Sequence, residues 1–124
     1  MFTRKIDLLL KSQIKFPATD IEQAGALGED LAFEQLQGML KGLKCKAKIF
    51  RSVRVPKGQG SGKYEIDLLL ISQAGILVIE VKHWSGHIFY ENGAWGQQRG
   101  SDKKAHPDPV ALNKDKLMSL RQWL

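Results

Sequence analysis

The chain has a single cysteine, Cys45, among its 124 residues. One cysteine excludes a disulfide within the chain and any zinc site built from several cysteines. Long apolar runs are also missing, because the longest lie within residues 66–71 and 74–79, far short of the roughly 20 residues that cross a bilayer. Residues 1–15 hold too short an apolar patch for a secretory signal. These absences favour a reducing, cytoplasmic location and no membrane partner.

Acidic residues are absent from residues 41–63, although the whole chain has 19 basic and 13 acidic residues and a formal charge of +6. The basic residues of this segment are Lys41, Lys44, Lys46, Lys48, Arg51, Arg54, Lys57 and Lys63. Such a block suits a nucleic-acid backbone, because each neutralised phosphate releases counterions. A solvated basic face would give the same pattern, so charge alone leaves both interpretations open.

The remaining composition is that of an ordinary globular protein, with 43% hydrophobic and 26% charged residues. The length predicts one domain, which we place at residues 19–124 after an amphipathic helix over residues 1–18. Within the domain we expect a helix over 19–43, strands over 46–55, 64–71, 75–82, 87–90 and 94–98, a loop over 101–109 and a helix over 109–124. This order predicts an α+β (or α/β) fold in which helices flank a mixed sheet.

The two strongest strand candidates, residues 64–71 and 75–82, are joined by a short turn. A turn centred between Gln73 and Ala74 pairs Ile71 with Ile76, and the same register places Asp67 opposite Glu80 and Glu65 opposite Lys82. One face of this hairpin is wholly apolar and is predicted to be core; its residues are Ile66, Leu68, Leu70, Leu77, Ile79 and Val81. The other face is apolar near the turn and charged at its open end.

Two opposed carboxylates repel one another unless a cation lies between them. Lys82 supplies one positive charge, and a divalent ion such as Mg²⁺, which prefers carboxylates and phosphate, would supply the rest. The alternative is a solvated strand end with a Glu65–Lys82 ion pair. A slip of one residue would put Asp67 and Glu80 on opposite faces.

Glu29 lies in the middle of the apolar stripe of the helix predicted over residues 19–43. An acid that faces a core is rarely unpaired. Glu29 therefore belongs either to a structural ion pair or to the same cleft as Asp67 and Glu80. On the back of this helix, Leu27 and Leu31 form a smaller patch, which we expect the N-terminal helix to cover.

Three sequence fragments resemble the nuclease-related domain family (NERD) of the PD-(D/E)XK, or restriction-endonuclease-like, superfamily. They are Gly28-Glu29, then Glu65-Ile66-Asp67, then Ile-Glu-Val-Lys-His-Trp-Ser-Gly over residues 79–86. The resemblance covers residues 24–120. Trp95 is similar to a tryptophan of the family's second hairpin. Two departures are the Asp108-Pro109 pair where the family often has Asn-Pro, and Leu112 where it often has Gln.

The resemblance implies a metal centre of Mg²⁺ or Mn²⁺ held by Asp67, Glu80 and the backbone carbonyl of Val81. It further implies that Lys82 orients and activates the attacking water and that Glu29 supports the metal site. The family usually continues into another strand, so we expect either a short member or a fragment, with a second copy or a partner chain completing the sheet.

The predicted function is hydrolysis of DNA by a metal-dependent nuclease. Nothing in the sequence reads base edges, so little sequence specificity is expected. A non-catalytic nucleic-acid-binding module with the same fold is the second interpretation, and a domain for protein contacts is the third.

Overall fold

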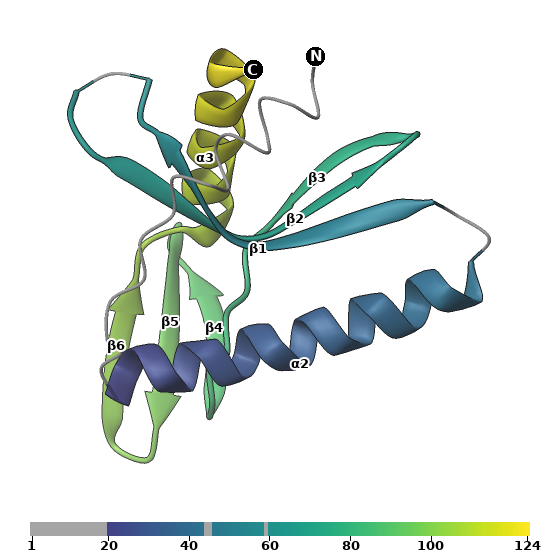
Figure 1. Ribbon diagram of the computed structural model, residues 1–124. Coiled ribbons are helices and arrows are strands. Elements are labelled where there is room, and N and C mark those ends of the chain that lie inside the picture. The colour runs from purple at the N-terminus through teal and green to yellow at the C-terminus, as the bar shows by residue number, and fades with distance from the viewer. Residues whose placement is uncertain (1–19, 44–45, 59) are drawn as a thin grey trace.

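The computed structural model describes residues 20–43, 46–58 and 60–124 (Figure 1). The helix predicted over residues 1–18, with Lys44 and Cys45, lies outside them. The described elements are the helices α2 (Asp20–Gly42) and α3 (Pro109–Trp123) and the strands β1 (Ala47–Pro56), β2 (Lys63–Ser72), β3 (Gly75–Ile79), β4 (His87–Glu91), β5 (Ala94–Arg99) and β6 (Asp102–His106). This arrangement confirms the predicted α+β class.

The main sheet has the strand order β1-β2-β3. Its second hairpin has the predicted register, in which Ser72 pairs with Gly75 and Ile71 with Ile76. The strand β3 nevertheless ends at Ile79 instead of continuing to residue 82. The reason lies in the next peptide, because the Val81 N–H donates to the Asp67 carboxylate at 2.8 Å and not to a strand carbonyl. A side chain thereby replaces the backbone ladder.

The second sheet has the order β4-β5-β6. The predicted hairpin turns at Asn92 (φ 51°) and Gly93 (φ 79°), the two left-handed residues of a type I′ turn. The loop expected over residues 101–109 is wrong, since Asp102–His106 forms β6. The described strands pair antiparallel in both sheets, not in the expected mixed way, because parallel pairing requires a long crossover.

Buried side chains gather in the centre of the main sheet, where α3 packs. The cluster consists of Val53, Val55, Ile66, Leu69 and Leu120. Ile66 and Leu69 are three apart, so the two-residue alternation of β2 breaks between them. The break lies opposite Ser52, a residue of β1 with a φ of 52°.

This break corrects the predicted core face of the hairpin. On β3, Ile76 and Val78 pack against the core cluster. Leu77, which was predicted to be core, is 58% exposed. Ile66, Leu68 and Leu70 of the predicted face are buried as expected. Leu68 and Leu70 nevertheless lie outside the main core cluster, so the two faces are exchanged beyond Asp67, which a strict alternation could not anticipate.

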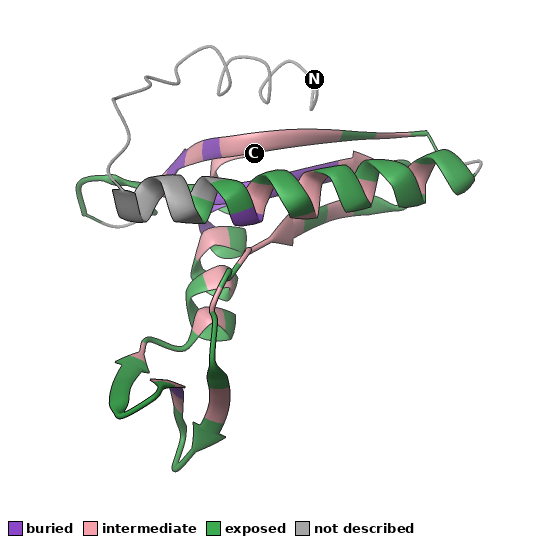
Figure 2. Ribbon diagram, turned by 90° about the horizontal axis from the view of Figure 1, so that it is seen from below, coloured by how far each residue is buried: buried purple, intermediate pink, exposed green. Residues whose placement is uncertain are grey.

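The helices lie on opposite sides of the main sheet. Helix α2 contacts β1 and β2, while α3 contacts all three strands. Figure 1 shows α2 running along the sheet and α3 standing on its other side. Figure 2 shows the second sheet projecting away from the rest, with few buried residues. No described helix is long and apolar enough to cross a membrane.

Candidate active site

Three carboxylates meet where α2 crosses β2. Glu29 comes from the helix, and Glu65 and Asp67 come from one face of the strand. One oxygen of each lies within 4.8 Å of the others. Asp67 is buried, Glu29 is half-buried and Glu65 is exposed. Of the two alternatives left open for Glu29, the structure places it beside Asp67.

Burial and the repulsion between neighbouring carboxylates raise the pKa of Glu29 and of Asp67. Burial, followed by the charges of Asp67 and Glu65, raises the pKa of Glu29 to about 7. Glu29 is also hydrogen-bonded to Asp67. Burial raises the pKa of Asp67 as well, against the lowering effect of the Val81 N–H. At neutral pH the cluster therefore carries less than its full negative charge.

Glu80 lies beside this cluster but is neutralised by two lysines. Its Oε1 is 2.8 Å from Lys82 Nζ, and its Oε2 contacts Lys116 Nζ from α3. The side chains of Glu80 and Lys116 are each only 12% exposed. Burial alone would raise the pKa of Glu80, but the two ammonium groups outweigh it and hold that pKa below its usual value.

The segment 80–86 joins these groups. Its Val81 N–H holds Asp67. Further along, His83 packs so closely on Gly28 of α2 that a Cβ built there would overlap the His83 Cβ. The Ser85 carbonyl then accepts a hydrogen bond from Gln97 Nε2 at 2.7 Å. The segment is thus fixed to β2, to α2 and to the second sheet.

The donor set of the acid cluster fits a hard divalent cation. Carboxylate oxygens are the ligands that Mg²⁺ and Mn²⁺ prefer. Among described residues, Glu29, Glu65 and Asp67 form a group with ligand atoms close enough to share one ion. Asp67 belongs both to the metal site predicted from the sequence and to the acid cluster of the structure.

The structure brings most of the predicted site residues together and adds two. Glu29 and Asp67 are in contact, and Glu80 and Lys82 adjoin them through Val81. The alternative Glu65–Lys82 pair is replaced by an Arg54–Glu65 pair at 3.6 Å. Sequence reasoning did not place Glu65 in the acid cluster, nor Lys116 on Glu80. The two-residue spacing of Glu65 and Asp67 was a signal for the first.

The predicted basic residues differ in their contacts and in their exposure. Arg51 pairs with Asp30 and lies over the Phe33 ring at 5.1 Å, and Arg54 pairs with Glu65. Lys57 Nζ lies 4.8 Å from the centre of the Tyr64 ring. Side chains that face solvent are those of Lys41, Lys46, Lys48 and Lys63. The two arginines therefore border the acid cluster, and the lysines extend outward from it.

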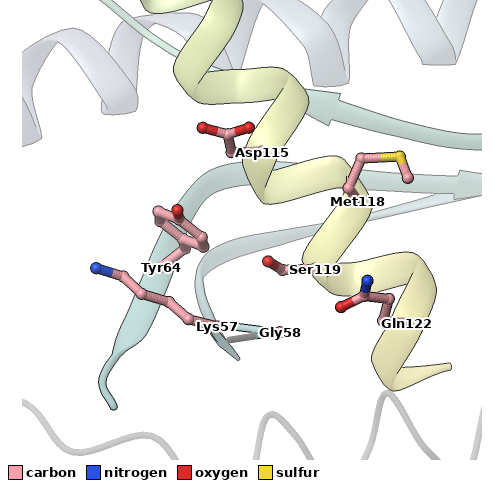
Figure 3. A pocket seen from close by; sticks show the side chains of 7 residues that line it. All are labelled: Lys57, Gly58, Tyr64, Asp115, Met118, Ser119 and Gln122. Carbon is pink, nitrogen blue, oxygen red and sulfur yellow. The ribbon is translucent and has the colours of Figure 1, made fainter. Parts of the chain in front are cut away.

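A separate hollow of about 300 Å³ lies between the β1–β2 hairpin and α3 (Figure 3). Its lining includes Lys57, Tyr64, Asp115 and Ser119. Of the predicted site residues it contains only Lys57. A single carboxylate with no convergent partner gives it no metal chemistry, so the acid cluster remains the candidate site.

Comparison with known proteins gives one family and one relative. The sequence model of a family described as "Nuclease-related domain" matches residues 24–124. A curated protein of Streptomyces coelicolor, "Probable kinase PglW", is 37% identical over 49 residues, which are 39% of this chain and 3% of that protein. The chain thus spans a small part of this relative's length. No solved structure matches the chain.

Proposed function

The chain belongs to the nuclease-related domain family, in the restriction-endonuclease-like superfamily, and from this premise we propose that it is a divalent-metal-dependent nuclease that hydrolyses DNA with little sequence specificity. The observation that carries the proposal is the convergence of Glu29, Glu65 and Asp67 within 4.8 Å. The Glu80–Lys82 pair beside them supplies the only other charged groups that the proposed mechanism requires.

We assign the metal to Asp67 together with Glu29 and Glu65, next to Glu80 and the backbone of Val81. When bound, Mg²⁺ or Mn²⁺ would polarise a phosphate oxygen and lower the pKa of a water molecule. With a pKa raised to about 7, Glu29 is partly protonated at neutral pH, and a bound cation would favour its ionised form. For Glu80 to become a ligand, one of its two lysines must release an oxygen.

Lys82 is the proposed catalytic cation. Its side chain is 36% exposed while its Nζ is held 2.8 Å from Glu80. The amine is therefore fixed in direction and still accessible to a phosphate or a water. An ammonium group aimed at developing negative charge stabilises the transition state of phosphoryl transfer. Lys116 is more deeply buried and acts on Glu80 instead.

The basic residues support DNA as the substrate. Arg51 and Arg54 border the acid cluster, and Lys41, Lys48 and Lys63 are exposed beyond them. Contacts of this kind bind phosphates and carry no sequence information. We therefore expect cleavage in many sequence contexts.

A non-catalytic nucleic-acid-binding module is the second candidate. It is favoured by the two ion pairs on Glu80, since a carboxylate neutralised by Lys82 and Lys116 is a poor metal ligand. In this reading the fold binds nucleic acid through its basic residues alone.

Cleavage assays separate the two candidates. Purified protein is incubated with single-stranded, duplex and branched DNA, with Mg²⁺, with Mn²⁺ or with EDTA. The nuclease proposal predicts metal-dependent cleavage that falls by about 100-fold or more in Asp67→Asn and Lys82→Ala, because each removes a group that acts at the reacting phosphate.

Matched controls lie on α3, where Asp115 and Lys114 are exposed. Asp115→Asn and Lys114→Ala change the same charges and should retain activity. Binding without cleavage by the wild-type protein in either metal would refute the nuclease and leave the module.

A further inference from the structure

A run of aromatic rings crosses one face of the second sheet. The strand register places Tyr90 beside Trp95 and Trp95 beside His106. The Tyr90 and Trp95 ring centres are 5.3 Å apart. Trp84 stacks on His106 with ring centres 4.1 Å apart and an angle of 18° between the planes. We call these four residues the aromatic run.

The aromatic run begins next to the candidate active site. Trp84 follows Lys82 by two residues, on the segment whose Ser85 carbonyl accepts a hydrogen bond from Gln97 of β5. Burial, with the nearby charges of Lys104 and Lys82, lowers the pKa of His106. The far end of the run at Tyr90 is 60% exposed. The run thus leads from the proposed catalytic lysine outward into solvent.

Positive charge accompanies the rings. Lys104 lies on the same face as the rings. It is two residues from His106, and its register partner Gln97 is two residues from Trp95, so the side chains of all four residues share one face of the sheet. Arg99 also lies on this face, two residues beyond Gln97, and its register partner on β6 is Asp102. Aromatic rings interleaved with cations are the elements with which proteins bind bases and phosphates of a single strand.

We propose that the aromatic run binds unpaired nucleotides, so that the substrate of this protein is single-stranded DNA or a single-stranded arm of a branched DNA. The inference rests on the proposed function, since it names the form of DNA that reaches the acid cluster. In a duplex the faces of the bases are stacked on one another, and a protein ring cannot reach them. In a single strand each base has a free face that can stack on Tyr90 or Trp95.

The arrangement also defines a path for single-stranded DNA across the surface of the protein. On this path, a phosphate of the bound DNA lies at Lys82, and the bases of the neighbouring nucleotides lie along Trp84, Trp95 and Tyr90. Because Trp84 and Lys82 share one fixed segment, binding at the run positions the strand for cleavage. Removing a ring should therefore weaken binding of single strands and leave duplex binding unchanged.

The test measures binding in EDTA, so that no cleavage is needed. Tyr90→Leu keeps an apolar side chain of similar size but has no ring, and Tyr90→Phe keeps the ring and loses the hydroxyl. We expect Tyr90→Leu to weaken binding of a labelled oligo-dT strand by about tenfold, in line with the loss of one stacked base. Tyr90→Phe should bind like the wild type, and blunt duplex should bind all three proteins equally.

Tryptophan fluorescence gives a second measurement that does not depend on Tyr90. Trp84 and Trp95 lie in the run, whereas Trp123 packs on the main core. Oligo-dT should quench the emission of Trp123→Phe at least as strongly as that of the wild type, because this variant lacks a ring that the DNA does not reach, and should quench Trp95→Phe clearly less. Equal quenching in Trp95→Phe, or equal loss of single-strand and duplex binding in Tyr90→Leu, would overturn the inference.

The result is independent of the nuclease assay. Ring-dependent binding without any cleavage would support the run and refute the proposed nuclease. Metal-dependent cleavage, with single-strand binding unaffected by Tyr90→Leu, would refute nucleotide binding by the aromatic run and would support the proposed nuclease activity.

Discussion

Glu29 is half-buried beside two other carboxylates, and this environment sets its pKa. Burial raises its pKa most, the charges of Asp67 and Glu65 raise it further, and the charge of Arg51 lowers it. The proton that Glu29 holds near neutral pH reduces the repulsion among the three carboxylates. Without a cation, the cluster is therefore a source of instability that grows as the proton leaves.

The stability of the metal-free protein should reflect this proton. The pKa of Glu29 rises from 4.5 to about 7 on folding, so its contribution to stability is complete below pH 4.5 and is lost as the pH rises through about 7. In EDTA, we expect Glu29→Gln to lessen the fall in unfolding free energy between about pH 5 and about pH 8 by on the order of 1–2 kcal/mol. The full shift in the pKa of Glu29 would correspond to a larger change in unfolding free energy. Glu29 is only half-buried, however, and water screens part of the interaction. Urea unfolding at both pH values measures the effect, and identical pH dependence in the two proteins would contradict it.

Lys116 is the second residue with a clear energetic role. Lys116→Met leaves Glu80 with Lys82 alone and should lower the unfolding free energy by about 1–3 kcal/mol at neutral pH, because a poorly exposed carboxylate loses a partner. Lys114→Met on the exposed side of the same helix is the matched control. A double-mutant cycle with Glu80→Gln tests the assignment, since purely additive losses would show that the two residues are not coupled.

Hydrophobic pattern and register indicated that Asp67 and Glu80 lie near one another, and they left Glu29 between an ion pair and this cleft. Glu29 interrupts an apolar stripe, and the short turn at residues 73–74 fixes the pairing that brings Glu80 toward Asp67. Lys116 could not be predicted in this way. Its place depends on how α3 docks on β3, where Asn113 Nδ2 donates to the Val78 carbonyl at 3.0 Å.

At the scale of elements, the approach of the segment 80–86 to α2 requires Gly28. The helix and the segment touch there without an intervening side chain. Gly28→Ala should push His83 away and weaken the hydrogen bond from Val81 to Asp67, even though alanine favours the helix itself. We expect a loss of about 1–3 kcal/mol in unfolding free energy and weaker metal binding by titration calorimetry.

Gly38 is the matched control for this substitution, because a Cβ built there meets no atom within 4 Å. Gly38→Ala should be neutral or stabilising, since it adds only helix propensity. Equal effects of the two substitutions would show that the close contact at Gly28 has no role.

The elements themselves were largely predictable, and the errors have identifiable causes. The described helices begin and end close to the expected residues, because Asp108 caps α3 through the Val110 N–H and Pro109 starts it. The strand β6 was missed because its sequence, Asp-Lys-Lys-Ala-His, lacks β-branched residues. The exchange of faces at Leu77 follows from Ser52, whose left-handed φ nothing in the sequence indicates.

At the scale of the whole molecule, the charge of +6 should make nucleic-acid binding strongly dependent on salt. The logarithm of the binding constant should fall linearly with the logarithm of salt concentration. Lys48→Ala removes an exposed cation and should reduce that slope by about 1 if Lys48 contacts a phosphate. Lys114→Ala is the control, and a slope unchanged in Lys48→Ala would remove this residue from the proposed nucleic-acid surface.

The projecting second sheet has a consequence for the order in which the molecule opens. It contributes no side chain to the main core cluster, and few of its residues are buried. Its backbone amides should therefore exchange with deuterium through local opening well before those of β2, whose amides wait for global unfolding. A bound oligonucleotide should slow exchange in β4–β6 selectively, which makes this sheet the natural place to observe ligand-induced ordering by mass spectrometry.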